Sequence, residues 1–288
     1  MYSLLENVNE KIDIHILHNQ DIAIEIIPVN IVKHKNLNNI QIYQVDLSKY
    51  NFPNLENVHV SEATYYRIFL ARYLPKDLEQ IIYIDADIVC VNNPIKQIKV
   101  YFEKIKKNKG VISARTEHKF SKNNEIFERL SKKSDYFNAG FLLINLNEWR
   151  INNIEEKLIH TMEKNYKKIV QWDQDVLNIF FDSKYEQLLD SFNFNSNKLK
   201  NKSLIKDEEI LFIHYIGSKK PWSVPQKIDA AYQIYHTFFE NLKLEKYHIT
   251  HTWKTNSIKN LFNLIISGEI KKLSNPTSYI ICVLKSLI

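Results

Sequence analysis

The first residues of the chain alternate apolar and polar side chains, which is the pattern of a β-strand with one covered face. Residues 11–17 place Ile12, Ile14 and Ile16 on the same side of an extended segment. A second strand is expected at 40–45, where apolar residues again dominate before an aspartate. These two segments predict a pair of strands early in the chain.

Helical spacing follows in residues 61–74, where apolar side chains recur every three or four positions. Ser61 has the hydroxyl of an N-cap, and Pro75 ends the predicted helix. The next apolar run, at 81–84, is continuous rather than alternating. A run of this kind is typical of a strand that is buried on both faces.

Further strands and helices alternate along the rest of the first 240 residues. Strands are predicted at 109–113, 140–144 and 211–213, and helices at 173–181 and, capped by Asn147, at 147–162. Strands that alternate with helices favour an α/β fold with a mostly parallel sheet flanked by helices on both faces. Ligands of such sheets bind beyond the carboxyl ends of the strands, so the chemistry is expected there.

The composition fits one ordinary domain followed by a tail. The chain has 288 residues, of which 44% are apolar and 25% charged, and these values exclude a disordered or fibrous protein. Residues 1–240 are predicted to form one domain, of the size that catalytic domains have, and residues 241–288 a tail of different character. The 4 glycines are too far apart for a G-x-G-x-x-G or P-loop motif, which excludes two large nucleotide-binding classes.

The distribution of charge limits the expected binding partners, and the small number of cysteines bears on the cellular compartment. The net charge of +6 is spread along the chain, whereas nucleic-acid binding usually needs a denser basic stripe, so no nucleic acid is expected. Cys90 and Cys282 cannot form a disulfide framework or a cysteine metal cluster, which favours a reducing compartment. No signal peptide and no apolar run long enough for a bilayer is visible, and we expect a cytoplasmic protein.

Two carboxylates follow the apolar run at 81–84. Asp85 and Asp87 stand one residue apart, with Ala86 between them, and such a pair at a strand end can hold Mg²⁺ or Mn²⁺, which in turn can bind a diphosphate. The alternative is a pair of solvated or turn-capping carboxylates, since a second Asp-x-Asp occurs at 173–175. Both interpretations stay open on this pattern alone.

A histidine follows the predicted strand at 211–213. A lone histidine beside an apolar run is usually a hydrogen-bonded core residue. The residues after His214 add a second interpretation, because Gly217 lets a ligand approach the backbone and Lys220 can place a positive charge on phosphate oxygens. A metal ligand followed by a phosphate-binding lysine would form a site for a leaving group.

Two further stretches offer polar groups next to predicted elements. Asn138 carries a donor and an acceptor, Ala139 follows, and Gly140 leaves space above the backbone, which suits a hydroxyl-rich ligand. The simpler alternative is a glycine bulge at the start of a strand. At 171–175 successive polar side chains precede a helix, and one of them can serve simply as an N-cap.

Taken in this order, the motifs resemble those of the retaining glycosyltransferases of family 8, especially the bacterial galactosyl- and glucosyltransferases of lipopolysaccharide or lipooligosaccharide outer core. Any one motif can arise by chance, whereas the ordered set is highly specific. The matching stretches are Tyr65-Tyr66-Arg67, residues 84–87, residues 136–145, residues 173–178 and residues 214–222.

The resemblance implies a GT-A type fold that transfers a hexose, galactose or glucose, from a UDP-sugar to a saccharide acceptor with retention of configuration. In the family pattern Asp85, Asp87 and His214 would ligate Mn²⁺, with Mg²⁺ as the other option, and Lys220 would support the diphosphate. The positions that match donor-binding residues are Arg67, Asp85, Ala86, Asn138, Ala139, Gly140, His214, Gly217 and Lys220.

The resemblance also places two residues at the reaction centre. Asp173 would hold the donor sugar, and Gln174 would lie beneath its reactive face. Retention can proceed through a covalent intermediate or through same-face attack guided by the leaving phosphate. A neutral amide is a poorer nucleophile than a carboxylate, which favours same-face attack, with Gln174 stabilising the oxocarbenium-like sugar.

The start of the chain departs from the family pattern. Family members begin with a strand and a polar turn that carries an aspartate, and only then reach the helix that residues 2–7 resemble; Met1 falls inside that helix. We therefore expect a GT-A fold that lacks its first strand and leaves a sheet neighbour unpaired. Either the natural start lies upstream, or the chain is a truncated and inactive sugar-nucleotide-binding protein.

The tail from residue 241 onward mixes basic residues with apolar ones such as Trp253 and Phe262. An amphipathic basic segment can rest on an anionic membrane surface, which would make the protein peripheral on the inner face of the cytoplasmic membrane, next to a lipid-linked saccharide acceptor. The alternative is a helix that packs on the catalytic domain.

A second enzyme class shares one of these motifs. Haloacid-dehalogenase-like phosphatases also place Asp-x-Asp after a buried strand, with Thr or Val two residues after the second aspartate, and Val89 satisfies the weaker form. This class does not explain residues 138–145 or 214–222. It remains the alternative enzyme that the sequence leaves open.

Overall fold

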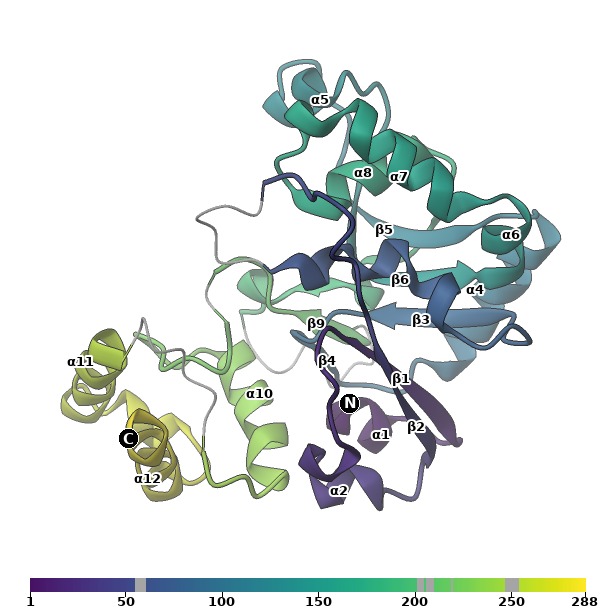
Figure 1. The fold of residues 1–288 in the computed structure, drawn as a ribbon. Helices are drawn as coiled ribbons and strands as arrows, with labels where there is room; N and C mark the ends of the chain where they lie inside the picture. Colours follow the sequence, from purple (N-terminus) through teal and green to yellow (C-terminus); the bar gives the residue numbers. More distant parts are fainter. Residues whose placement is uncertain (55–60, 201–204, 206–209, 219, 247–253) are drawn as a thin grey trace.

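The strands of the chain form three small sheets, with helices on both faces and a helical unit at the C-terminal side (Figure 1). A computed structural model describes residues 1–54, 61–200, 205, 210–218, 220–246 and 254–288. The expected α/β architecture with a helical C-terminal part is therefore confirmed.

The first sheet pairs two parallel strands near the N-terminus. Helix α1 (Tyr2–Asn7) precedes β1 (Ile12–His18), and α2 (Val29–Val32) leads into β2 (Leu37–Gln44). Both strands were expected, although β2 begins three residues earlier than the pattern indicates. Buried side chains of α1, α2 and β2 cover one face of this sheet.

The helix expected at 61–74 is correct in position and wrong in type. Residues Glu62–Ile68 form a 3₁₀-helix, η2, and only α3 (Leu70–Tyr73) is α-helical. A 3₁₀-helix aligns residues three apart, and here Thr64 and Arg67 both reach the same carboxylate, that of Asp173. The requirements of the site therefore explain the tighter winding.

The central sheet has the strand order β3-β6-β5-β7. Its members are β3 (Gln80–Ile84), β6 (Tyr136–Asn145), β5 (Ile112–His118) and β7 (Glu186–Gln187). Strand β6 lies in the middle of the sheet, and all of its residues are buried. A third sheet joins β4 (Ile88–Cys90), β9 (Phe212–His214) and β8 (Phe194–Asn195) in the order β4-β9-β8.

The expectation of a mostly parallel sheet is wrong, because the sheets are mixed. Three strand pairs are parallel, β1/β2, β5/β7 and β8/β9, and three are antiparallel, β3/β6, β5/β6 and β4/β9. A strand that is buried on both faces has the same continuous apolar run in either direction. The sequence pattern therefore located the strands without giving their direction.

Helices cover both faces of the central sheet. Their bounds are α4 (Ile95–Lys107), α5 (Glu125–Leu130), α6 (Leu146–Ile151), α7 (Ile154–Lys164) and α8 (Trp172–Phe181). Short 3₁₀ turns connect elements at Ile24–Ile26, Tyr166–Lys168, Asp190–Phe192, Ser196–Lys198 and Glu269–Lys272.

The single helix expected at 147–162 is two helices. Asn145, not Asn147, caps α6, and its side chain accepts a hydrogen bond from the Glu148 N–H. Asn153 then adopts a left-handed backbone conformation with φ 50°, which no α-helix continues through, and α7 starts at the next residue. An asparagine tolerates this conformation, so the apolar spacing runs on while the helix turns.

The C-terminal part is a small helical unit. Helices α10 (Ala230–Asn241), α11 (Lys254–Ile266) and α12 (Pro276–Leu287) surround a core of their own, and Leu264 and Val283 are completely buried in it. The other face of α10 packs through Ala231 and Ile234 against the third sheet. Trp253 lies outside the described residues, and no described helix has the length and apolarity needed to span a membrane.

Candidate functional site

A large cavity of about 1280 Å³ lies where β3, β6 and β9 meet the start of α8. The loop after β3 contributes residues 85–87, β6 contributes 138–140, and α8 contributes 173–174. Strand β9 contributes His214, and Ile216, Gly217 and Lys220 follow it. Arg67 reaches the same cavity from η2. Every residue that the sequence proposed for the site therefore lines this one cavity.

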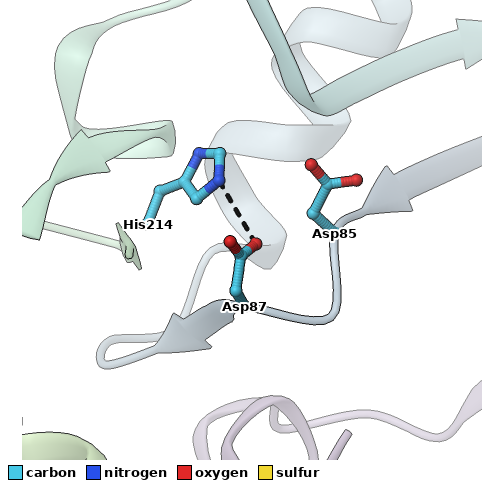
Figure 2. Close-up of side chains that lie close together, drawn as sticks. All are labelled: Asp85, Asp87 and His214. Atoms are coloured by element: carbon cyan, nitrogen blue, oxygen red, sulfur yellow. Dashed lines mark ion pairs between the residues drawn. The ribbon is translucent and has the colours of Figure 1, made fainter. Parts of the chain in front are cut away.

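Two carboxylates and an imidazole gather at its floor (Figure 2). Strand β3 ends at Ile84, and the turn that follows presents Asp85 and Asp87. Strand β4 pairs with β9 so that Ile88 lies opposite His214, which brings the imidazole beside Asp87. One ligand atom of each of the three side chains lies within 4.8 Å of the others.

The histidine ring is held in one orientation. His214 Nδ1 lies 2.9 Å from Asn193 Oδ1, and the amide group of Asn193 donates through Nδ2 to Asn138 Oδ1 at 2.8 Å. The Asn193 oxygen is therefore the acceptor for an Nδ1–H, and the lone pair of His214 stays on Nε2, 3.2 Å from Asp87 Oδ1. Two acceptors that face each other fit a shared cation, and the N and O donors suit Mn²⁺ or Mg²⁺.

Gly140 is required by the cluster itself. A Cβ atom at this position would lie 2.3 Å from His214 Cε1 and 2.9 Å from Asp85 Oδ2. The space above the glycine is thus filled by the two side chains rather than left to a ligand. The Asp85 N–H also donates to the Gly140 carbonyl at 2.8 Å, which fixes the turn against β6.

Lys220 lies against the cluster. Its ammonium group hydrogen-bonds Asp87 Oδ2 and donates to the Tyr215 carbonyl at 3.0 Å. Burial raises the pKa of Asp87, but the hydrogen bond and charge that His214 supplies when its ring is protonated, and the charge and hydrogen bond of Lys220, outweigh it and lower the pKa to about 2. Asp87 is therefore an anion at neutral pH.

Arg67 connects the cluster of Asp85, Asp87 and His214 to the opposite wall of the cavity. Its guanidinium group is buried, with NH2 2.9 Å from Asp85 Oδ1 and Nε 2.8 Å from Asp173 Oδ2. The group stacks over the ring of Tyr83 at 4.4 Å, and the Tyr83 hydroxyl donates to Asp85 at 2.7 Å. Burial lowers the pKa of Arg67, but the carboxylates of Asp173 and Asp85 raise it further, so the cation persists.

Asp173 offers an acceptor to the cavity. Its Oδ1 accepts a hydrogen bond from the Thr64 hydroxyl at 2.6 Å. Its Oδ2 is near Arg67 Nε, but that N–H donates to the Thr64 carbonyl, so Oδ2 is paired in charge without accepting a hydrogen bond. Burial raises the pKa of Asp173 to about 6. Oδ2 is therefore a buried acceptor with no hydrogen-bond partner in the described residues, and Arg67 balances its charge.

Gln174 is held by three polar contacts. Its Oε1 accepts a hydrogen bond from the Ala139 N–H at 2.9 Å, and its Nε2 donates to the Tyr136 hydroxyl at 3.2 Å and to Glu117 at 3.3 Å. The flipped amide would set two donors against each other at Ala139 and two acceptors at Glu117. The orientation of the amide is therefore fixed by its surroundings.

Asp175 has a different position from Asp173 despite the shared Asp-x-Asp pattern. Its side chain is completely buried, accepts hydrogen bonds from the N–H groups of Val170 and Gln171, and forms an ion pair with Arg129 at 2.6 Å. Gln171 occupies the N-cap position of α8, but its side chain makes no cap hydrogen bond. The second Asp-x-Asp motif is thus one cavity-facing residue and one structural residue.

Sequence reasoning missed some of the side chains around the site. Glu117 lines the cavity and accepts a hydrogen bond from Asn138 Nδ2 at 3.2 Å. An acidic residue at the end of β5 is the same signal that singled out Asp85, so the sequence could have indicated it. Asn193, which orients His214, lies in a short 3₁₀ connection with no signal at all.

Solved structures share this architecture. The galactosyltransferase LgtC, solved with donor and acceptor sugar analogues, superposes with a TM-score of 0.67 at 22% identity, over 88% of this chain and 95% of that chain. The glycosyltransferase GlyE of Streptococcus pneumoniae gives a TM-score of 0.57 at 22% identity, over 85% and 56%. The fold is the GT-A fold of glycosyltransferases, as expected.

Sequence comparison gives the family. The glycosyl transferase family 8 profile matches residues 1–224, and the chain belongs to this family. It is 33% identical over 190 residues to the lipopolysaccharide 1,3-galactosyltransferase of Salmonella typhimurium, and 30% identical over 195 residues to the lipopolysaccharide glucosyltransferase WaaO of Escherichia coli K12. Each match covers 64% of this chain. The chain spans about half the length of these relatives, 56% of the galactosyltransferase and 55% of WaaO. This family assignment replaces the alternative interpretation of the chain as a haloacid-dehalogenase-like phosphatase.

Proposed function

We propose that the chain transfers a hexose, galactose or glucose, from a UDP-sugar to a saccharide acceptor with retention of configuration. The observation that carries the proposal is the convergence on one cavity of the Asp85, Asp87 and His214 cluster with Asp173 and Gln174, in a member of family 8. The names of the related lipopolysaccharide enzymes support a lipopolysaccharide or lipooligosaccharide core as the acceptor.

Asp85, Asp87 and His214 would hold Mn²⁺, or Mg²⁺ in its place. When bound there, the cation neutralises negative charge that grows on the departing UDP. The buried Asn193 keeps the Nε2 lone pair of His214 on the ligand side, and Gly140 leaves room for the imidazole.

The diphosphate and the sugar would contact different parts of the cavity wall. Lys220 places its ammonium group beside Asp87, where it can reach a phosphate oxygen next to the cation. Gly217 and Ala86 are exposed at the same end and let a ligand approach the backbone. On the opposite wall, Asp173 Oδ2 can accept a hydrogen bond from a sugar hydroxyl.

Gln174 would support same-face attack. Its amide is neutral and a poor nucleophile, and its carbonyl oxygen gives only one lone pair to Ala139. The remaining lone pair can face the positive charge that develops on the sugar ring. Asp175 is a poor candidate for a covalent role, because its carboxylate is completely buried among four donors, the N–H groups of 170 and 171, Arg129 and Tyr136.

The C-terminal helices would bring the enzyme to an anionic membrane surface. One side of α11 and α12 forms the core with α10, and the other leaves apolar side chains exposed. Those of α11 are Ile258, Phe262, Ile265 and Ile266. Replacing Phe262 and Ile266 by Ser spares the buried core, and we expect these changes to reduce cosedimentation with phosphatidylglycerol vesicles several-fold. Equal cosedimentation of both proteins would exclude this surface as the contact.

A donor screen tests the reaction itself. The chain is incubated with each UDP-hexose, Mn²⁺ and a core saccharide; UDP release gives the rate, and the anomeric proton signal of the product gives the stereochemistry. The proposal expects UDP-galactose or UDP-glucose to be consumed with an α-linked product. Binding of a UDP-sugar without turnover would instead support a sugar-nucleotide-binding protein.

A further inference from the structure

Trp172, the first residue of α8, has a backbone conformation that large side chains rarely adopt. Its φ is 48°, in the left-handed region, where a Cβ atom crowds the backbone and glycine is the usual residue. Such outliers persist where their surroundings hold them, and they gather at functional sites. The next two residues are Asp173 and Gln174, and all three line the large cavity. The strained position therefore comes immediately before the two residues proposed to meet the sugar.

The turn that leads into Trp172 is braced on its inner side by Asp175. The completely buried carboxylate of Asp175 accepts hydrogen bonds from the N–H groups of Val170 and Gln171, both at 2.8 Å. Arg129 holds that carboxylate in turn at 2.6 Å. These contacts hold the backbone ahead of Trp172, but none of them reaches its indole ring.

A second brace comes from Asn54, which lies 118 residues earlier in the chain. The Trp172 indole Nε1–H donates to the Asn54 carbonyl at 2.7 Å, and the Asn54 side-chain amide donates to the Val170 carbonyl at 2.6 Å. These two reciprocal hydrogen bonds are here called the indole clasp. Asn54 is also left-handed, with φ 57°, a conformation that asparagine tolerates better than tryptophan does. The clasp thus ties the strained residue to a segment outside α8.

The segment on the far side of the indole clasp is itself anchored. The Pro53 carbonyl accepts a hydrogen bond from the buried Tyr65 hydroxyl at 2.9 Å, and the ring of Phe52 stacks on Tyr65 with the centroids 4.5 Å apart. Tyr65 belongs to η2, which also carries the Thr64 hydroxyl that donates to Asp173. One element, η2, therefore supports both the clasp and the first of the cavity-facing residues of α8.

We propose that Trp172 is a positioning residue, whose indole, bound to Asn54, fixes the left-handed turn and thereby sets the place of Gln174 in the cavity. A glycine would adopt this turn with less strain, but it would bring no indole to the clasp and would leave the turn free to take other conformations. Asp173 keeps its own anchor on Thr64, so the loss of the clasp falls mainly on Gln174. The inference rests on the proposed transfer reaction and adds a residue that acts through another.

Two substitutions in the full chain separate the indole clasp from the backbone strain. Trp172→Phe keeps an aromatic ring and loses the N–H, whereas Trp172→Gly removes the strain and the ring together. We expect kcat of UDP release to fall about tenfold in the first and about 100-fold in the second, with the donor KM within about threefold, because a misplaced group costs rate rather than ground-state binding. Lys109→Gly is the matched control. Lys109 is also left-handed, with φ 50°, but it is exposed after α4 and is not among the described residues that line the cavity, so kcat should not change.

A second measurement follows the position of Gln174 without any substrate. The Ala139 N–H donates to Gln174 Oε1 at 2.9 Å, so its exchange with solvent reports whether Gln174 is in place. We expect the Ala139 amide to exchange at least about tenfold faster in both Trp172 variants, and the Leu142 amide, in the same strand, to exchange as in the parent. Asn54→Gly keeps the carbonyl acceptor and suits φ 57°, but it loses the bond to the Val170 carbonyl, so a smaller change in the same direction is expected.

Three outcomes overturn the inference. Unchanged kcat and unchanged Ala139 exchange in both Trp172 variants would mean that the turn holds without the indole. A raised acceptor KM with unchanged kcat would make Trp172 a contact of the acceptor instead. Equal effects of Trp172→Gly and Lys109→Gly would assign the change to the relief of strain alone. If Trp172→Gly does not accumulate, Trp172→Phe and Asn54→Gly decide the question. If the parent protein releases no UDP from any UDP-sugar, the proposed reaction fails, while Ala139 exchange still tests the clasp.

Discussion

The two ends of the large cavity are built in opposite ways. At the end that holds Asp85, Asp173, Gln174 and His214, here called the donor end, each of these side chains is held by a named polar partner. At the other end, between β1 and β3, the cavity is lined mainly by apolar side chains, such as Ile14, Ile16, Ile82 and Ile84. The donor end therefore offers oriented polar groups, whereas the other end offers apolar surface.

The largest effect on the reaction rate is expected when a carboxylate of the candidate metal site is made neutral. Asp85→Asn should lower the rate of UDP release roughly 10²–10³-fold, the scale of losing one stabiliser of transition-state charge, while the melting temperature changes little because Asp85 is partly exposed. The exposed Asp77→Asn is the matched control and should keep full activity. A rate within threefold of the parent would remove Asp85 from the reaction.

A smaller loss is expected from a methyl group at the floor of the site. Gly140→Ala would push His214 and Asp85 apart, and we expect roughly a 10–100-fold loss of Mn²⁺ affinity with about 1–3 kcal/mol of destabilisation. Gly110→Ala is the control, because its Cβ would meet Ile105 Cγ2 at an ordinary 3.5 Å. Calorimetric titration with Mn²⁺ and urea unfolding check the two effects. Unchanged affinity would show that the cluster tolerates the displacement.

The partly buried strand β3 can be compared with the fully buried strand β6 by truncating one apolar side chain in each. Leu143→Ala in β6 should cost about 2–5 kcal/mol of unfolding free energy, and Ile82→Ala in β3 about 1–2 kcal/mol, because Ile82 is only partly buried. Urea unfolding measures both. Equal costs would mean that the side chain of Ile82 is packed as well as that of Leu143.

The smallest effect is a pH dependence from Asp173. The folded-state pKa of about 6 lies above the ordinary value of an aspartate, so the folded protein binds the proton more tightly than the unfolded chain. The contribution of Asp173 to stability is fully present below about pH 4 and is lost as the pH rises through 6. The hydroxyl-accepting carboxylate forms over the same range, so the rate of UDP release should rise about twofold from pH 6 to 8. Asp173→Asn should remove this dependence from both the rate and urea unfolding.

The sequence predicted the parts of the fold that local patterns encode. Apolar runs located β1, β3, β6 and β9, because a strand that is buried needs apolar side chains. Strand direction, the 3₁₀ winding of η2 and the break at Asn153 depend on contacts and backbone conformations that no apolar period records. The spacing of apolar residues therefore could not predict that the sheets are mixed.

The candidate site divides in the same way. Asp85, Asp87 and His214 stand next to strand ends and could be picked out one by one, and the structure gathers all three. Asn193 could not, because its role exists only through its contacts with two residues that are distant in the chain. Sequence motifs thus indicate the groups that do chemistry, while the groups that orient them emerge from packing.

Arg67 gives the donor end a property that neither of its carboxylate partners has alone. One guanidinium group touches both Asp85 and Asp173, so a positive charge arriving at Asp85 competes with Arg67 there and leaves more of its field on Asp173. Occupancy at the two places is then linked in free energy. For the proposed cation and sugar, thermodynamic reciprocity requires that the factor by which the cation changes sugar affinity equals the factor by which the sugar changes cation affinity.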